Sequence, residues 1–177
     1  MCFNISITKF TDKIRTVTFN AKAETIFEKP SFKNSITKKR CLVLVDGFYE
    51  WHEYNNKKYP FYIKLKNNEA FALAGIWDTW IDKSGEKNNT FSVITTDANK
   101  LIAKIHNTKK RMPIILKKKD ESKWLEEIND KEIKSLFYSY DDTNLIAYPI
   151  SKLITQKGIN TNIPQVIEKF EYKDLNY

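Results

Sequence analysis

The sequence predicts an α+β fold, with a curved antiparallel β-sheet or barrel-like core and peripheral helices. Three observations predict it: six early segments are rich in Val, Ile, Phe, Tyr and Trp, short turns separate several of them, and helical spacing of apolar residues begins only afterwards. Strands joined by short turns pair in antiparallel fashion. Because 177 residues and 20.9 kDa suit one hydrophobic core, a single domain over residues 1–177 is expected.

The strand-like segments share β-branched and aromatic residues, which are enriched in strands. They span residues 14–20, 41–47, 48–54, 59–66, 71–80 and 90–96. Turn-forming pairs stand between several of them: Asn55 and Asn56, Asn67 and Asn68, and Ser84 and Gly85. The sequence therefore predicts a series of hairpins through the middle of the chain.

Helical spacing begins after residue 96. Apolar residues at i, i+3, i+4 and i+7 predict a helix packed on the sheet, namely Ala98, Leu101, Ile102 and Ile105. His106 is expected at the C-terminal end of this helix. Further on, the pattern predicts a strand at 111–116, a helix near 120–128, a third short helix at 131–137 and a last strand at 145–150. In the helix near 120–128, three apolar residues are expected to face inward: Trp124, Leu125 and Ile128.

The chain is basic. It has 30 Lys and Arg residues against 22 Asp and Glu residues, a net charge of +8, and nearly all of the positive charge comes from lysine. Such a field attracts polyanions. The longest uncharged apolar run, 70–77, is far shorter than the roughly 20 residues of a membrane helix, and no secretory signal is evident at the start. A cytoplasmic protein without a membrane partner is expected.

The metal and disulfide chemistry of the chain is limited by its few cysteines and histidines. Cys2, Cys41, His52 and His106 form neither a C-x-x-C pattern nor an H-x-x-x-H pattern. The sequence therefore supports no metal site and no disulfide framework, and no cofactor is expected.

Cys2 is the most informative residue for chemistry. A small second residue favours removal of Met1, which would leave an amine and a thiol on adjacent carbons of Cys2. The amine is substantially neutral at physiological pH and forms an imine with an aldehyde, and the thiol then closes a five-membered thiazolidine ring. On position alone, a small buried side chain is the commoner role for a cysteine.

Glu50 and His106 are candidates for proton transfer. Glu50 interrupts an apolar and aromatic run between Tyr49 and Trp51, a setting that raises a carboxyl pKa, although strand alternation would equally point it to solvent. The helix dipole favours His106 as an imidazolium that can donate a proton, but a histidine there can also simply cap the helix.

Basic and aromatic residues suggest contacts with nucleic acid. Phosphate contacts are plausible for Lys22, Arg40, Lys109, Lys110 and Arg111, although lysine runs are commonly only solvated surface. Several aromatic side chains could stack on bases or fill the core: Phe48, Tyr49, Trp51, Trp77 and Trp80.

Several separated motifs share one order and spacing along the chain. They are Met1 with Cys2, residues 20–25, 40–43, 46–51 and 71–77, Thr95 with Thr96, and His106 followed by Arg111, Met112 and Pro113. In this arrangement the chain resembles the SOS-response-associated peptidase (SRAP) family, from Asn20 to about Leu116 and at Cys2. The resemblance implies a protein that senses abasic sites in single-stranded DNA, links its terminal cysteine to the sugar aldehyde as a thiazolidine, and protects the lesion during the DNA damage response.

The resemblance also implies roles for individual residues. Cys2 matches the crosslinking nucleophile, and Asn20 matches the asparagine that orients the terminal amine. Glu50 matches the residue that shuttles protons, and His106 matches the histidine that assists ring opening and crosslink reversal. Lys22 replaces the family's usual arginine.

Further matches concern DNA contacts. Thr95 stands where a backbone- or phosphate-contacting threonine is expected, and Arg111 matches the arginine after the histidine. With Lys22, Arg40, Lys109 and Lys110 they form the predicted DNA-binding set. The partner is expected to be single-stranded DNA containing abasic sites, and the chain is expected to be a monomer.

Two departures separate this chain from the common family pattern. Only Phe3 to Phe19 lie between Cys2 and Asn20, where the family usually has several dozen residues, so part of the sheet and of the aromatic wedge is expected to be missing. The loop from His106 to Arg111 is longer than usual and is expected to bulge.

Competing interpretations come from other functional classes. One is a cysteine peptidase that acts on other proteins or on its own leader. The family resemblance also implies a lyase activity. Another is a single-stranded-DNA-binding module whose chemistry has lapsed.

Overall fold

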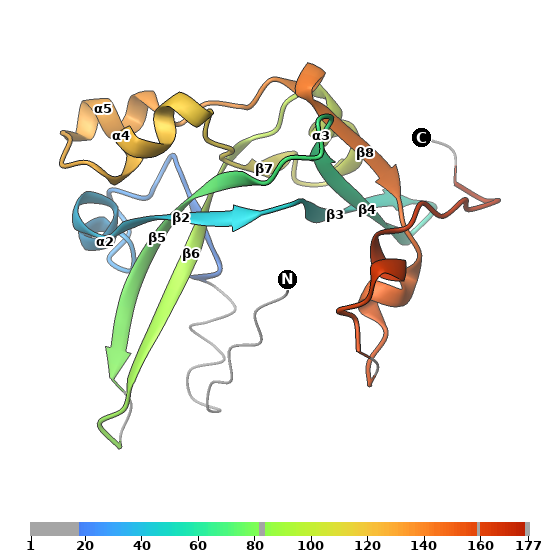
Figure 1. Ribbon diagram of the computed structural model, residues 1–177, viewed down its shortest axis with the longest axis horizontal. Coiled ribbons are helices and arrows are strands. Elements are labelled where there is room, and N and C mark those ends of the chain that lie inside the picture. Colours follow the sequence, from blue (N-terminus) through green and yellow to red (C-terminus); the bar gives the residue numbers. More distant parts are fainter. Residues whose placement is uncertain (1–17, 82–83, 159, 176–177) are drawn as a thin grey trace.

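The computed structural model describes residues 18–81, 84–158 and 160–175, and in them two β-sheets carry short helices (Figure 1). The predicted α+β class is confirmed. Within these ranges the strands form one five-stranded and one three-stranded sheet, which do not close into a barrel. None of the helices in this part of the chain is long and apolar enough to cross a lipid bilayer.

The larger sheet has the strand order β1-β6-β5-β2, with β7 also paired to β6. Its strands are β1 (Asn20–Lys22), β2 (Arg40–Val45), β5 (Phe71–Ile81), β6 (Lys87–Asp97) and β7 (Arg111–Pro113). The pairs β2–β5, β5–β6 and β6–β7 are antiparallel, but β1 runs parallel to β6. The parallel pairing was not predicted, because it joins strands far apart in the sequence rather than neighbours across a turn.

The smaller sheet has the order β3-β4-β8 and is antiparallel throughout. Its strands are β3 (Phe48–Tyr54), β4 (Lys57–Leu65) and β8 (Leu145–Pro149). Asn55 and Asn56, with φ of 49° and 59°, form the two-residue turn between β3 and β4. The chain passes from the larger sheet to the smaller at Gly47, where a Cβ atom would lie 2.4 Å from the ring of Tyr62.

The helices are short: α2 (Lys33–Lys38), α3 (Lys100–Ile105), α4 (Glu121–Leu125) and α5 (Asp130–Ser135). Short 3-10 helices span Lys118–Asp120, Asp142–Asn144, Lys152–Thr155 and Pro164–Ile167. The predicted helix near 120–128 is a single turn. Trp124 is buried as predicted and donates from Nε1 to Cys41 O at 3.0 Å, but the inward orientation of Leu125 is wrong, because that side chain is 55% exposed. One turn cannot direct two adjacent residues to the same side.

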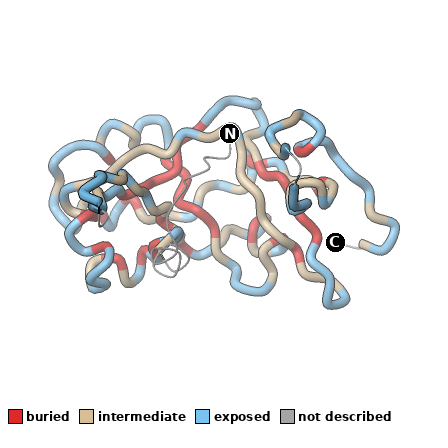
Figure 2. The backbone as a smooth tube through the Cα atoms, turned by 90° about the horizontal axis from the view of Figure 1, so that it is seen from below, coloured by how far each residue is buried: buried red, intermediate tan, exposed pale blue. Residues whose placement is uncertain are grey.

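The buried side chains form two core clusters. One fills the space between the larger sheet and helices α2, α4 and α5, and includes Ile36, Ile94 and Trp124. The other joins the smaller sheet to α3 and includes Phe61 and Ile102. Figure 2 shows the buried stretches along the interior strands, with the exposed stretches mostly in the connecting loops. In Figure 1, α2, α4 and α5 gather at one end of the molecule, whereas α3 lies away from them, beside the smaller sheet.

The segment after β7 links the two clusters. Met112 and Ile115 belong to the cluster under α3, whereas Ile114 and Leu116 belong to the cluster under α4 and α5. Of the strand predicted at 111–116, only Arg111–Pro113 forms a strand, but residues 112–116 are all buried. This stretch fixes the position of α3, which precedes it, relative to both sheets.

Candidate active site

Glu50 and His106 meet where α3 packs on the smaller sheet. Glu50 lies in the middle of β3, and His106 is the residue that ends α3. His106 Nδ1 lies 3.2 Å from Glu50 Oε2, and each side chain is 19% exposed. The two predicted acid/base residues are thus adjacent and open to solvent on one side.

The position of His106 is fixed by the end of its helix. Its backbone N–H donates to Ile102 O at 2.7 Å, so it closes the last turn of α3. Its Nδ1 also lies 3.0 Å from the carbonyl oxygen of Arg111. Because a carbonyl only accepts, Nδ1 carries the ring proton in the neutral imidazole, and Nε2 is left with the free lone pair. His106 can therefore accept or return a proton through Nε2.

The environment of Glu50 favours its protonated form. Burial raises the pKa of its carboxyl group to about 7, and this outweighs two lowering effects, a hydrogen bond from the Trp51 N–H and the charge of Lys109. Strand alternation does not point Glu50 to open solvent, because α3 covers this face of β3 at the edge of the smaller sheet. At neutral pH both forms of the carboxyl group are populated, as an acid/base group requires.

Arg111 is held by acidic side chains rather than extended into solvent. Its guanidinium binds Glu24 at 2.7 and 2.9 Å, Asp97 at 3.0 Å and Thr95 O at 2.7 Å. The side chain is 17% exposed, and its Nε is buried without a hydrogen-bond partner. The hydrogen bond from Arg111, the largest effect, lowers the pKa of Glu24. Sequence reasoning missed Glu24 and Asp97, because only the fold brings three separated segments together.

Other predicted residues gather near Arg111. Lys22 lies opposite Thr95 in the pairing of β1 with β6, and both side chains belong to the strand ends beside Arg111. Lys109 and Lys110 are exposed on the loop that follows His106. This loop bulges as expected: Lys110 has a φ of 50° and donates its N–H to His106 O at 2.8 Å.

Asn20 and Arg40 occupy different surroundings. Asn20 is exposed at the start of β1, opposite Val93. Arg40 lies between α2 and α4, where its guanidinium donates to the carbonyls of Ile36, Thr37 and Trp124 at 2.8 to 2.9 Å and also to that of Glu126. The structure thus groups Arg40 with the helices at the far end of the molecule from α3 (Figure 1). Its predicted contact with DNA stays a prediction.

Cys2 lies outside the described residues, so its role as the crosslinking nucleophile stays a prediction. In the remainder of the chain that the structure describes, no three His, Cys, Asp or Glu side chains cluster as metal ligands. The chemistry visible in this part is therefore that of the Glu50–His106 pair.

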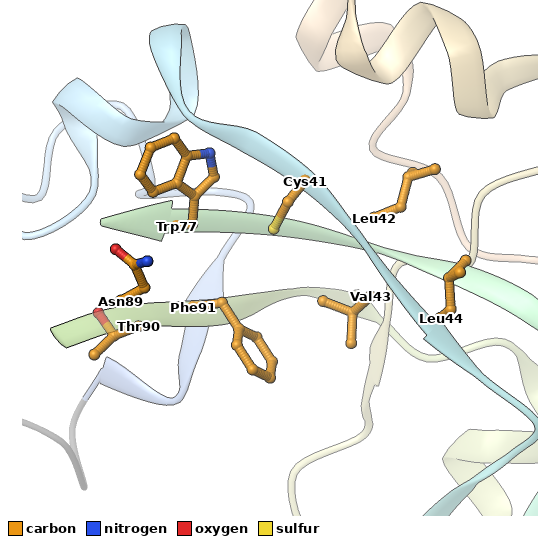
Figure 3. A pocket seen from close by; sticks show the side chains of 8 residues that line it. All are labelled: Cys41, Leu42, Val43, Leu44, Trp77, Asn89, Thr90 and Phe91. Carbon is orange, nitrogen blue, oxygen red and sulfur yellow. The ribbon is translucent and has the colours of Figure 1, made fainter. Parts of the chain in front are cut away.

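A separate apolar hollow of about 530 Å³ lies on the larger sheet (Figure 3). Residues of β2, β5 and β6 line it, with Trp77 and Phe91 among them, and both of these rings are partly exposed. Asn20, Glu50 and His106, the predicted catalytic residues that the structure describes, do not line this hollow. The acid/base pair and this apolar hollow are thus different parts of the described molecule.

Comparisons with known proteins identify the family. The family model described as SOS response associated peptidase (SRAP) matches residues 5–157. Abasic site processing protein YoqW of Bacillus subtilis (strain 168) is 39% identical over 160 residues, which are 89% of this chain and 69% of that protein. Abasic site processing protein HMCES of Rattus norvegicus is 32% identical over 179 residues, covering 84% of this chain and 49% of that protein.

A solved structure agrees with the sequence relatives. The crystal structure of a protein from Bacteroides thetaiotaomicron has a TM-score of 0.85 and 42% identity, and the match covers 90% of this chain and 68% of that chain. The family model spans most of the chain, and Glu50 and His106 lie within the matched residues. The chain therefore belongs to the SOS response associated peptidase (SRAP) family.

Proposed function

We propose that this chain processes abasic sites in single-stranded DNA by linking Cys2 to the open-chain sugar as a thiazolidine, which shields the lesion. The observation that carries the proposal is the contact between Glu50 and His106, an acid/base pair whose side chains are each 19% exposed. Family membership and the names of YoqW and HMCES as abasic site processing proteins support it.

The pair suits the first chemical step. An abasic sugar exists mainly as a cyclic hemiacetal, so its aldehyde is exposed only when a proton leaves the anomeric hydroxyl and another reaches the ring oxygen. Glu50, with a pKa raised to about 7, can supply or remove a proton near neutral pH. Nε2 of His106 can take the other part, because Nδ1 is directed to the Arg111 carbonyl and to Glu50.

The later steps use Cys2. Its amine attacks the aldehyde carbon, and loss of water from the resulting carbinolamine forms an imine. The thiol then adds across the carbon–nitrogen double bond, its sulfur bonding to carbon and its proton passing to nitrogen. The balance is one water released and one ring formed, with no oxidant or reductant. Asn20, at the start of β1, is proposed to orient the amine, as the family resemblance implies.

The DNA strand is proposed to bind beside this pair. Lys109 and Lys110 are exposed on the loop that begins at His106, and Lys22 is exposed on β1. Their charges are suited to phosphates. Thr95 and Arg111 complete the proposed set beside the pair, whereas Arg40, held by backbone carbonyls between α2 and α4, is proposed as a separate contact. The guanidinium of Arg111 is engaged by Glu24 and Asp97, so we assign it first to holding this surface together.

The reach of Cys2 is compatible with the proposal. The chain between Cys2 and Thr18 is about 16 residues long, and an extended chain covers roughly 3.3 Å per residue, so it spans on the order of 50 Å. The same terminal amine, through its imine, would also allow a lyase reaction, and the pair would allow release of a leader that precedes Cys2.

Three forms of the protein test the proposal on an abasic-site oligonucleotide. The form that begins with Cys2 should give one covalent oligonucleotide per chain by mass spectrometry. A form with an uncleavable extension before Cys2 keeps the thiol but has no free amine, so it should give no stable adduct. Cys2→Ala should form only an imine that disappears on denaturation unless it is reduced. Equal crosslinking by the extended form would overturn the thiazolidine mechanism, and peptide cleavage without crosslinking would favour a peptidase.

A further inference from the structure

Asn107 connects the loop of His106 to the strand of Glu50. Its Oδ1 accepts from the Glu53 N–H at 3.0 Å, and its Nδ2 donates to Glu53 O at 2.8 Å. Both backbone groups of one residue are therefore bound by a single side chain. The side chain is half-buried, so these hydrogen bonds are partly shielded from water.

The edge of β3 explains this contact. β3 is an outer strand of the smaller sheet, and Glu53 pairs with Lys58 of β4 on its inner side. The N–H and carbonyl groups of Glu53 that point outward would otherwise lack a neighbouring strand. The amide of Asn107 supplies one acceptor and one donor in the arrangement that a paired strand would present. Asn107 thus docks the loop at one register of β3.

A second contact fixes the same helix to the same strand. His52 is buried, and its Nδ1 lies 2.9 Å from the carbonyl oxygen of Lys104, in the last turn of α3. The contact between Glu50 and His106 therefore belongs to a set of three links between β3 and the end of α3. α3 has only six residues, and a helix this short is not stable without such anchoring.

We infer that Asn107 is a positioning residue, which holds His106 at the distance and orientation that its contact with Glu50 requires. Asn107 follows His106 directly, so its docking fixes the backbone at the point where the imidazole leaves the chain. The loop is also closed by the Lys110 N–H, which donates to His106 O. The loop has three residues between Asn107 and Arg111, and without the docked amide its length would allow His106 to move away from Glu50.

The kinetic consequence of this inference rests on the proposed function, but its structural consequence does not. The chain contains only two histidines, His52 and His106, so nitrogen-15 NMR of the imidazole rings resolves each one. The wild-type spectrum should show His106 with its proton on Nδ1. In Asn107→Ala, the ring should exchange between tautomers, so the nitrogen-15 shifts of Nδ1 and Nε2 should move toward each other.

The kinetic test measures adduct formation with an abasic-site oligonucleotide across pH. Asn107→Ala should slow the reaction by about tenfold or more, because small misplacements of an acid/base group are costly, and should displace the inflection assigned to Glu50 near pH 7. Asn107→Asp keeps the acceptor for Glu53 N–H but loses the donor, so a smaller effect of the same kind is expected. This second variant keeps the test decisive if Asn107→Ala does not fold.

Asn129→Ala is the matched control. Asn129 also uses its side chain twice, accepting from Glu132 N at 3.0 Å and contacting Glu132 Oε2 at 2.8 Å, but at the start of α5. The Asn129→Ala variant should have a lower melting temperature, with the His106 spectrum and the pH profile of the reaction unchanged.

Two results would overturn the inference: an unchanged His106 tautomer in Asn107→Ala, or an equal change in Asn129→Ala. If the wild-type protein forms no adduct, the proposed function fails while the NMR comparison still decides the role of Asn107.

Discussion

Arg111 and Glu24 form a bidentate ion pair, in which Nη1 donates to Oε1 at 2.7 Å and Nη2 donates to Oε2 at 2.9 Å. The two residues come from the loop after β1 and from the first position of β7, so the pair ties these segments together. The same arginine offers its backbone carbonyl to His106. Displacement of Arg111 would therefore disturb the candidate active site as well as the packing of β7.

The Arg111–Glu24 pair should contribute measurably to stability. Arg111→Lys keeps the charge but cannot make two parallel hydrogen bonds, so the free energy of unfolding should fall by about 2 kcal/mol. Urea denaturation of the wild type, Arg111→Lys, Glu24→Gln and the double variant gives the coupling between the two residues. Fully additive losses would show that the two side chains act independently.

Glu50→Gln should slow adduct formation by about 10²-fold or more while DNA affinity stays nearly the same. The amide retains the size of the carboxyl group but cannot exchange protons, which removes general acid/base assistance. Adduct formation is measured on denaturing gels, and affinity by fluorescence anisotropy with an uncleaved, non-abasic strand as control. Unchanged kinetics in this variant would remove Glu50 from the mechanism.

Glu50 should also make stability depend on pH in a specific direction. Its pKa is about 7 in the folded chain against an ordinary value of 4.5, so between these values the unfolded chain loses a proton that the folded chain keeps. Stability should therefore fall as the pH rises through this window, by up to about 3 kcal/mol. Relative to the wild type, Glu50→Gln should gain stability from pH 4 to pH 8. Urea denaturation at both pH values measures this, and a constant difference would contradict it.

His106→Ala should slow both formation and release of the adduct. The variant loses the Nε2 group that we assign to ring opening in one direction and to reversal in the other. Single-turnover formation and the decay of the purified adduct report the two rates separately. Asn20→Ala provides the comparison: it should slow formation through poorer placement of the amine, and an equal effect on release would argue against that assignment.

Replacement of both Lys109 and Lys110 by Ala should weaken DNA binding for all sequences alike. Each lysine that neutralises a phosphate on a single strand contributes about 0.7 to the slope of log affinity against log salt concentration. The double variant should therefore lose about 1.4 from that slope if both lysines contact DNA. Lys117 and Lys118, exposed beyond the buried stretch that follows β7, are the matched control pair. An unchanged slope in the first variant would make the loop a surface feature without a role in binding.

The sequence was most informative where local chemistry decides the structure. β3 begins and ends at the predicted residues, because an aromatic-rich run is bounded by Gly47 and by the Asn55–Asn56 turn. α3 was predicted from the spacing of its apolar residues, of which Ile102 and Ile105 are buried. In contrast, the parallel pairing of β1 with β6 depends on contacts between segments far apart in the chain, and no local pattern contains it.

The candidate site followed the same division. Glu50 and His106 could be named from the motifs, but the residues themselves left open whether Glu50 faces solvent and whether His106 only caps its helix. The packing of α3 on β3 brings the two side chains to 3.2 Å from each other, so they are neighbours in the folded chain. The side chains that hold the site, Asn107 and Glu24, could not be predicted, since an amide or a carboxylate is unremarkable until the fold supplies its partner.

Glu50 lies on a strand of the smaller sheet, whereas His106 lies on the connection between two strands of the larger sheet, and this has a consequence for how reactivity is lost. α3 connects β6 to β7, both strands of the larger sheet, whereas β3 belongs to the smaller one. Neither sheet alone brings Glu50 and His106 together. A chain in which only one sheet is assembled would therefore lack the acid/base pair that the proposed reaction with an aldehyde uses. In the proposed mechanism, assisted reaction of Cys2 with an aldehyde is therefore tied to completed folding.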